Sequence, residues 1–343
     1  MGVNLSGLME FETADLPALS GKSVAIDAYN TIYQFLSMIR QPDGSPLCDG
    51  RGRVTSHLSG ILYRTTNLIG QGIEPSFVFD GKPHALKRAT LDARRERREK
   101  AEGEWEEALE SGDMKRAFSK AQQTSRMTPE IRESARELIG LLGMPVVDAP
   151  SDGEAQAAHM CMRGDVWASA SQDFDSILFG TPILVRNLTM NGRRKMPGRD
   201  QYRDVKTEII DSKAFLERLG VTREQLVDAC ILMGTDFNPG ISGIGPKKGL
   251  KLVRDHGDIE HALAHMGKEI PEYPEVRDIF LGGGHSTDGY DVRPGKIDRG
   301  GVVEMLSEYG FSRDRVEGTL DKMEDSRKAA SDKRKQRSLD AWL

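Results

Sequence analysis

KSVAIDAYNTIYQFLSMI, residues 22–39, changes its hydrophobic spacing halfway along. Residues 23–26 are small or apolar and predict a short strand, whereas Ile32 and Leu36 are four residues apart, the spacing of one helix face. Asp27 stands where the predicted strand ends. The stretch therefore predicts a strand followed at once by a helix, with a carboxylate at the junction.

The same arrangement recurs later in the chain. Strands followed by acidic residues are predicted in EPSFVFDGKP (74–83), MPVVDAPSDGEAQAAHMCM (144–162) and DVWASASQDFDSILFG (165–180), and PILVRNLT (182–189) reads as a further strand. Strands that alternate with helices form a mostly parallel sheet covered on both faces. We therefore expect an α/β fold with a mostly parallel, twisted central sheet and helices on both faces.

Six acidic residues follow these predicted strands. In parallel sheets ligands bind beyond the carboxyl ends of the strands, which meet at one edge. Taken singly, each acid fits a turn or a helix cap, and Ser151 with Glu154 matches a capping box. Taken together, they place more negative charge at one edge than a compact domain tolerates without cations. The six are Asp27, Asp80, Asp152, Glu154, Asp173 and Asp175.

Asp173 and Asp175 are separated by a single residue. In an extended segment such a pair points to one side, so we expect both carboxylates to face one point and share a cation. The alternative is a strand that ends in an ordinary polar turn. All candidate ligands are oxygen donors, which favours magnesium or manganese over zinc. Two such ions about 4 Å apart are the usual device for in-line cleavage of a phosphodiester.

The composition is that of a globular protein, with 38% hydrophobic and 29% charged residues among 343. No apolar stretch approaches the roughly 18 residues that span a bilayer, and the N-terminus lacks the order of a signal peptide. We therefore expect an intracellular protein with no membrane partner. Three cysteines without a CxxC pair argue against a disulfide framework and a zinc site.

The net charge of −5 conceals a strongly basic segment. Residues 82–100 hold eight Lys or Arg against three acids. This segment opens a stretch, residues 84–136, that reads as largely helical with a Gly-Asp break at 112–113. Two readings fit: a solvated bridging helix, or a wall that faces phosphates above the acidic edge.

A second basic element follows a predicted helix at about 222–233. After a glycine-rich turn, Pro246 opens another helix, and Gly243 and Gly245 leave backbone amides free to meet an anion at its N-terminus. Positive charge is added by Lys247, Lys248 and Lys251. The pattern predicts a helix-hairpin-helix that clamps the DNA backbone, with an ordinary helical hairpin as the alternative. Asp236, in the turn, is a seventh candidate acid.

The end of the chain, RKAASDKRKQRSLDAWL (327–343), is polar and basic, so we expect a flexible tail over 326–343. Gln336, Leu339 and Trp342 recur every three residues, which places an apolar plug on one face of a helical turn. A tryptophan exposed on a loose tail favours a docking peptide.

Motifs along nearly the whole chain stand in an order that resembles one family. They are MGVNL (1–5), AIDAYNTIYQFL (25–36), FVFDGKP (77–83), APSDGEAQAA (149–158), ASQDFDSILFG (170–180), GTDFNPGISGIGPKKGLKL (234–252), GFSRDRV (310–316) and QRSLDAWL (336–343). The chain resembles the structure-specific 5′ nucleases, and most closely the flap endonucleases of archaeal and eukaryotic replication.

The resemblance implies an endonuclease, with 5′–3′ exonuclease activity, that hydrolyses a phosphodiester at the base of 5′ flaps in Okazaki-fragment maturation and DNA repair. It implies that the seven acids hold two Mg²⁺ ions, with Mn²⁺ as a substitute. Lys87 and Arg94 match the basic residues that the family places over the scissile phosphate, and Tyr33 matches the aromatic that stacks on the adjacent base. Gly2 is a further implied DNA contact.

The resemblance also implies a single nuclease domain and a tail. The domain covers 1–325 and the tail covers 326–343. Within the domain, the N-terminal nuclease region lies at about 1–100 and the helical arch at about 84–136. The internal nuclease region lies at about 137–255, with the helix-hairpin-helix at about 222–256. The family's hairpin binds K⁺ at the positions matched by 240–251. The implied partners of this monomer are branched DNA with a 5′ flap and a sliding clamp, the latter bound by Gln336, Leu339, Trp342 and Leu343. The implied location is the cytoplasm, in association with the nucleoid, in a cell without a nucleus, and otherwise the nucleus.

Three residues depart from the family pattern. Asp152 stands where Glu is usual, which predicts a weaker or water-mediated hold on the first ion. Gly249 replaces a common Ala, a change that weakens a helix by up to about 1 kcal/mol. Leu343 replaces a final aromatic residue, which predicts lower affinity for the clamp.

Other functions are also weighed on the sequence. A relative that cuts bubbles or four-way junctions would share the same acids, although the arch-like basic segment favours flaps. A non-catalytic, clamp-bound DNA scaffold would bind flaps without magnesium-dependent products, but the acids would then repel DNA without purpose. A phosphomonoesterase would leave the duplex clamp without a role.

Overall fold

Seven strands form one sheet in a computed structural model that describes residues 2–190, 192–195, 202–282 and 287–340. Their order is β1-β9-β6-β5-β2-β3-β4. The strands are β1 (Glu12–Ala14), β2 (Ser23–Asp27), β3 (Glu74–Phe79), β4 (Val146–Asp148), β5 (Ala168–Ala170), β6 (Ile183–Arg186) and β9 (Thr207–Asp211). A separate antiparallel pair is formed by β7 (Gly192–Lys195) and β8 (Tyr202–Val205).

The central strands run in one direction. β2 pairs in parallel with β5 on one side and β3 on the other, and β6 and β4 extend the parallel part outward. At one edge β9 runs antiparallel to β6, and β1 runs antiparallel to β9. The predicted mostly parallel sheet is thus confirmed, and the carboxyl ends of β2 to β6 meet at one edge.

Helices cover both faces because alternate residues of a strand point to opposite sides. In β2, Val24 and Ile26 enter one apolar core, whereas Ala25 enters another. The first core involves α1 (Ala28–Met38), α2 (Ser56–Gly60), the π-helical turn η2 (Ile61–Thr65), α3 (Thr66–Gly70), α6 (Pro129–Leu141), α14 (Arg299–Glu308) and α15 (Arg313–Asp340). The opposite side carries α7 (Gly153–Met162), α8 (Asp175–Leu178), α9 (Ser212–Leu219), α10 (Arg223–Met233), α11 (Pro246–His256), α12 (Ile259–Met266) and α13 (Tyr273–Leu281). Short 3₁₀ turns are η1 (Leu16–Leu19) and η3 (Ala85–Lys87).

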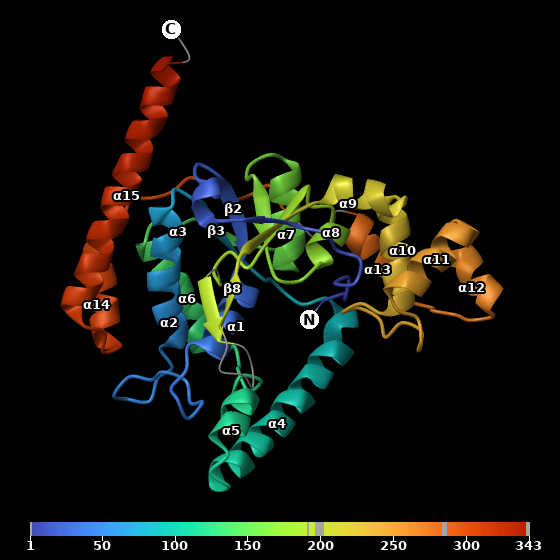
Figure 1. Ribbon diagram of the computed structural model, residues 1–343, viewed down its shortest axis with the longest axis horizontal. Helices are drawn as coiled ribbons and strands as arrows, with labels where there is room; N and C mark the ends of the chain where they lie inside the picture. Colours follow the sequence, from blue (N-terminus) through green and yellow to red (C-terminus); the bar gives the residue numbers. More distant parts are fainter. Residues whose placement is uncertain (1, 191, 196–201, 283–286, 341–343) are drawn as a thin grey trace.

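Two helices project from the body as a pair (Figure 1). They are α4 (Arg88–Glu110) and α5 (Met114–Ala121), and the chain turns between them at the predicted Gly-Asp break. Small side chains let the helices approach each other, and Ala101, Ala108, Ala117 and Ala121 are buried. The indole Nε1 of Trp105 donates a hydrogen bond to the carbonyl of Asp43, 3.4 Å away. The pair is therefore tied to the loop that follows α1.

The predicted flexible tail is helical in the structure as far as Asp340, because α15 continues through it. Arg327, beyond the predicted start of the tail, donates to the carbonyls of Leu142 and Gly143 at 3.1 and 3.2 Å and to that of Gly295 at 3.1 Å. These bonds anchor the helix to the body, and its Lys, Arg and Ala residues favour helix. The side chains of Gln336 and Leu339 are not described, and Trp342 and Leu343 lie outside the described residues.

In the described part of the chain, no helix is long and apolar enough to cross a membrane. α15 has sufficient length, but it is densely charged.

His57, in α2, predicts a dependence of stability on pH. Its side chain is buried, its Nε2 lies 2.8 Å from the hydroxyl of Ser134, and its Nδ1 has no hydrogen-bond partner among the described residues. Burial lowers the pKa of His57 from 6.5 to about 4. The stability conferred by a neutral His57 is therefore present above pH 6.5, and it is lost as the pH falls towards 4, since only the unfolded chain then binds the proton. Between pH 7 and pH 5 this loss amounts to about 2 kcal/mol.

Urea unfolding of the native chain and of His57→Gln at both pH values measures that loss, because glutamine keeps a polar group and does not titrate. The two chains should differ in their pH dependence by about 2 kcal/mol. Parallel pH profiles would show that His57 does not titrate as described.

Candidate active site

The structure brings six of the predicted acids to the carboxyl edge of the parallel strands. Asp27 ends β2 and caps α1, and Asp80 follows β3 directly. Asp152 caps α7, and Glu154 lies in its first turn. Asp173 and Asp175 follow β5. The seventh acid, Asp236, comes from the turn after α10. It lies close enough to this edge for its charge to raise the pKa of Asp175.

The expectation that Asp173 and Asp175 lie in an extended segment is wrong. β5 ends at Ala170, and Asp175 is the first residue of α8. The chain bends here because the ring of Phe174 turns into the apolar core, where it is buried, and because the hydroxyl of Ser171 accepts a bond from the Asp173 amide at 3.2 Å. The pair therefore meets at a strand-to-helix turn.

The capping-box reading of Ser151 and Glu154 is also wrong. The cap of α7 is Asp152, which makes no side-chain capping bond. The carboxylate of Glu154 instead accepts bonds from the hydroxyls of Ser171 at 2.7 Å and Ser176 at 3.4 Å. Glu154 is thereby turned towards the segment that carries Asp173 and Asp175.

The acids repel one another at this edge. Burial raises the pKa of Asp27, and Asp80 and Asp173 raise it further. Burial likewise raises the pKa of Glu154, followed by the charges of Asp175, Asp173 and Asp27. The pKa of Asp175 is raised to about 7 by burial and then by Asp236. Buried carboxylates that raise one another's pKa are stabilised in their charged form by cations.

Two basic side chains from the start of the α4 region meet these acids. The ammonium of Lys87 forms an ion pair with Asp152, and Arg94 donates to both carboxylate oxygens of Asp236, at 2.7 and 2.5 Å. Burial alone would lower the pKa of Lys87, but Asp152 and Asp80 outweigh it and the pKa is raised. The hydroxyl of Thr90 also donates to the Asp236 carbonyl at 2.9 Å. The projecting helix pair is thus bonded at its base to the acidic edge.

Two backbone amides that hold the acids were not predicted from the sequence. The amide of Val3 donates to Asp175 at 2.7 Å, and that of Gly153 donates to Asp80 at 2.6 Å. A Cβ on Gly2 would lie 2.3 Å from a carboxylate oxygen of Asp175, so a side chain at this position would displace that carboxylate. Backbone contacts of this kind leave no side-chain signal in a sequence.

The donor set fits magnesium or manganese. The seven acids offer oxygen atoms only, as these hard cations require. Within the described ranges no three His, Cys, Asp or Glu side chains converge as a ready-made metal cluster. Two of the seven carboxylates, Asp152 and Asp236, face Lys87 and Arg94 instead. The oxygen donors therefore fit the cations, and Asp152 and Asp236 are paired with basic side chains in this structure.

The remaining predicted site residues lie on other elements. Tyr33 is half-buried on α1, which begins at the acidic edge. Gly245 caps α11 and Pro246 opens it, as predicted. Gly243 has a φ of +79°. The exposed lysines Lys247, Lys248 and Lys251 follow on α11.

Gly249, which departs from the family pattern, has a packing role. It is buried where α11 lies against α10, and a Cβ would come 3.0 Å from the carbonyl oxygen of Ala229 and 3.2 Å from the side chain of Met233. The glycine therefore accommodates Met233 between the two helices.

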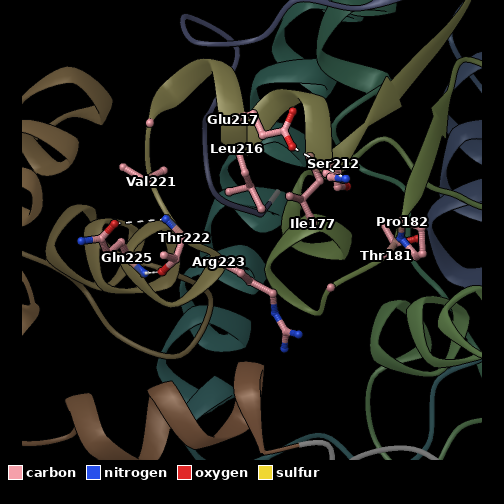
Figure 2. Close-up of a pocket in the computed structure, with 13 residues that line it drawn as sticks. Ile177, Thr181, Pro182, Ser212, Leu216, Glu217, Val221, Thr222, Arg223 and Gln225 are labelled. Atoms are coloured by element: carbon pink, nitrogen blue, oxygen red, sulfur yellow. Dashed lines mark hydrogen bonds and ion pairs between the residues drawn. The ribbon is translucent and has the colours of Figure 1, made fainter.

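One surface hollow of the described structure is lined by the side chains drawn in Figure 2. It has a volume of about 500 Å³ and is lined by residues of α8, α9, α10 and the loop between α9 and α10, including Ile177, Leu216 and Val221. Arg223 lies at this hollow and donates to the carbonyls of Leu178 and Phe280 at 3.0 and 2.8 Å. None of the seven acids lines it.

Comparison with known proteins covers the whole chain. Residues 3–101 match the XPG N-terminal domain and residues 143–236 match the XPG I-region, and these two ranges contain all seven acids. Flap endonuclease 1 of Methanococcoides burtonii is 47% identical over 100% of both chains, and that of Archaeoglobus fulgidus is 49% identical over 94% of this chain and 96% of its own. The solved structure of flap endonuclease-1 from Methanococcus jannaschii, 38% identical, superposes with a TM-score of 0.76 over 96% of this chain and 99% of its own. The chain belongs to the flap endonuclease 1 family.

Proposed function

We propose that this chain is a structure-specific 5′ flap endonuclease, with 5′–3′ exonuclease activity, that hydrolyses one phosphodiester at the base of a 5′ flap in Okazaki-fragment maturation and DNA repair. The observation that carries the proposal is the gathering of seven acids at one sheet edge, with the base of a projecting basic helix bonded to them through Lys87 and Arg94. The family relationship supports the same activity.

The proposed ligands of two Mg²⁺ ions, replaceable by Mn²⁺, are the seven acids. When bound, the ions supply Lewis acidity and an activated water for in-line hydrolysis. The hydroxyls of Ser171 and Ser176 orient Glu154, and the amides of Val3 and Gly153 orient Asp175 and Asp80. Gly153 and Ser176 lie on α7 and α8, so part of this support comes from helices.

Lys87 and Arg94 are proposed to bind the scissile phosphate. Both already bind carboxylate oxygens, and phosphate oxygens present the same acceptor chemistry. Positive charge fixed beside the reacting phosphate stabilises the charge that develops during hydrolysis. Tyr33, on α1, is proposed to stack on the base beside the cut, and Gly2 to lie at the DNA path.

The duplex is proposed to bind the turn between α10 and α11. The N-terminus of α11 follows Gly243 and Gly245, and exposed backbone amides at a helix N-terminus attract phosphate. Lys247, Lys248 and Lys251 would add contacts that do not read bases, and K⁺ is proposed to bind at 240–251. We further propose that the chain is a monomer at the chromosomal DNA, in the nucleoid or the nucleus, and that residues 336–343 bind a sliding clamp.

Removal of the metal tests the activity. A 5′-labelled double-flap DNA should be cut at the flap base in Mg²⁺ and left intact in EDTA. In the absence of DNA, Mg²⁺ should also raise the melting temperature of the protein, because it binds the folded state alone. Cleavage that continues in EDTA would contradict the metal-dependent mechanism.

Comparison of substrates separates the proposed function from its alternatives. A flap endonuclease should cut flap DNA faster than bubble or four-way-junction DNA. Faster cutting of bubbles or junctions would favour the related nucleases. Tight flap binding without products in Mg²⁺ or Mn²⁺ would favour a scaffold.

A further inference from the structure

A chain of three hydrogen bonds leads to Asp173 from outside the acidic edge. The hydroxyl of Thr189 donates to Oε1 of Gln34 at 3.2 Å, and Nε2 of Gln34 donates to Oδ1 of Asn30 at 3.0 Å. Nδ2 of Asn30 then donates to Oδ2 of Asp173 at 3.2 Å. Asn30 and Gln34 are one turn apart on α1, whereas Thr189 comes from the turn after β6.

The donor-to-acceptor direction of these three hydrogen bonds is fixed at the Asp173 end. A carboxylate only accepts hydrogen bonds, so Asn30 must present its NH₂ group to Asp173 and its oxygen to Gln34. Gln34 must then present its NH₂ group to Asn30 and its oxygen to Thr189, whose hydroxyl supplies the donor. Thr189 therefore supplies the hydroxyl donor that holds Gln34 in the orientation in which Gln34 supports Asn30.

The position of Thr189 is fixed by burial and by the turn in which it lies. Its side chain is buried, and the turn that holds it is closed by a bond from the Met190 amide to the Asn187 carbonyl at 3.2 Å. Asn187 has a φ of +58°, in the left-handed region that asparagine tolerates better than most residues. The chain of bonds thus starts from a fixed point.

Asp173 needs such support because no regular element carries it. It stands between the end of β5 and the start of α8, and its amide is held by the hydroxyl of Ser171. Its carboxylate faces the negative charges of Asp27, Asp175 and Glu154, whose pKa values it raises. Without a donor on its other side, that repulsion would turn the carboxylate away.

We propose that Asn30 is a positioning residue that orients the carboxylate of Asp173 for binding of the divalent cation, and that Gln34 and Thr189 hold Asn30 in place. The proposal rests on the metal-binding function proposed above. Partners that orient metal ligands typically change metal affinity 10- to 100-fold when they are removed.

Binding of Mn²⁺ to the full-length chain without DNA tests the proposal, with unbound Mn²⁺ measured by electron paramagnetic resonance. Asn30→Ala should weaken Mn²⁺ binding about tenfold or more, and Thr189→Val should weaken it about three- to tenfold although Thr189 touches no acid. Thr189→Ser keeps the hydroxyl and should bind as the native chain does. The half-saturating Mg²⁺ concentration for cleavage should rise by the same factors, with flap binding in EDTA unchanged.

Thr181→Val is the matched structural control. Thr181 is buried, and its hydroxyl bonds to that of Ser169 at 3.0 Å and to the Ile183 carbonyl at 3.1 Å, so its loss also removes buried bonds near β6. Mn²⁺ affinity should be unchanged in this variant. An equal loss of Mn²⁺ affinity in Thr181→Val and Thr189→Val would show that the loss comes from destabilisation of the fold, and it would overturn the proposal.

The double variant separates action through Asn30 from any other route. Since Thr189 acts through Asn30, Asn30→Ala with Thr189→Val should bind Mn²⁺ as weakly as Asn30→Ala alone. Additive losses, or native affinity in both single variants, would overturn the proposal. A native chain that neither binds Mn²⁺ nor cuts flaps would instead overturn the proposed function.

Discussion

Asp173→Ala should slow cleavage of a double-flap DNA by roughly a thousandfold and leave binding of that DNA intact. Loss of one ligand removes about 4 kcal/mol of transition-state stabilisation in a metal-assisted hydrolysis. Binding should persist because the lysines of α11 are untouched and because one negative charge near the phosphates is gone. Single-turnover cleavage in Mg²⁺ and a binding assay in EDTA measure the two quantities.

Asp148→Ala is the control for this variant. Asp148 also ends a parallel strand, β4, but its carboxylate is exposed and binds Arg136 at 2.7 Å. Its replacement should leave the cleavage rate within about twofold, because surface ion pairs contribute little. Native cleavage by Asp173→Ala, or equal losses in both variants, would show that Asp173 is not a metal ligand.

Gly240→Ala should lower the free energy of unfolding by at least about 3 kcal/mol. Gly240 has a φ of +68°, and a Cβ would lie 2.2 Å from the backbone N of Gly234 and 2.4 Å from the carbonyl carbon of Met233. Backbone atoms cannot move aside as a flexible side chain can. The turn between α10 and α11 would have to open, which would break the bond from the Ile241 amide to the Leu232 carbonyl at 2.9 Å.

Gly243→Ala, in the same turn, measures the free-energy cost of a left-handed backbone conformation without a steric clash. Gly243 has a φ of +79°, but a Cβ there meets nothing within 4 Å. Its loss of stability should be only about 1 to 2 kcal/mol, the usual cost of a left-handed conformation. Urea unfolding compares the variants, and similar losses at the two positions would contradict the close approach of the backbone at Gly240.

The sequence predicted the parallel sheet and the position of most acids because both depend on local patterns. Asp27 and Asp80 follow apolar strands, and parallel strands end at a common edge. The helix that begins at Pro246 was readable for the same reason, since proline at a first helical position follows from local geometry.

Contacts between segments that are distant in the sequence could not be predicted from such local patterns. Asp173 does not lie in an extended strand, because the burial of Phe174 decides where the chain turns. The bond from Val3 to Asp175 joins residues 172 positions apart and uses a backbone amide, which every residue but proline possesses. The link between Thr189 and Asn30 through Gln34 requires knowledge of how β6 and α1 pack.

The roles of Lys87 and Arg94 came from the family resemblance rather than from charge. Residues 82–100 contain eight basic side chains, and nothing in their spacing distinguishes these two. The structure does so by placing them against Asp152 and Asp236. The helical end of the chain was missed for another reason, since the anchor at Arg327 binds carbonyls from segments that are remote in sequence.

α15 gives the last described residues, up to Asp340, a fixed direction relative to the body. Asp340 lies thirteen positions after Arg327, so the helix extends about 20 Å past its anchor. A flexible segment of that length would have a root-mean-square span of about 20 Å as well, but without a preferred direction. The helix therefore leaves the distance nearly unchanged and removes the angular freedom. The sliding clamp that we propose as the partner of residues 336–343 would then hold the nuclease at a more defined angle to the DNA than it would through a flexible tether.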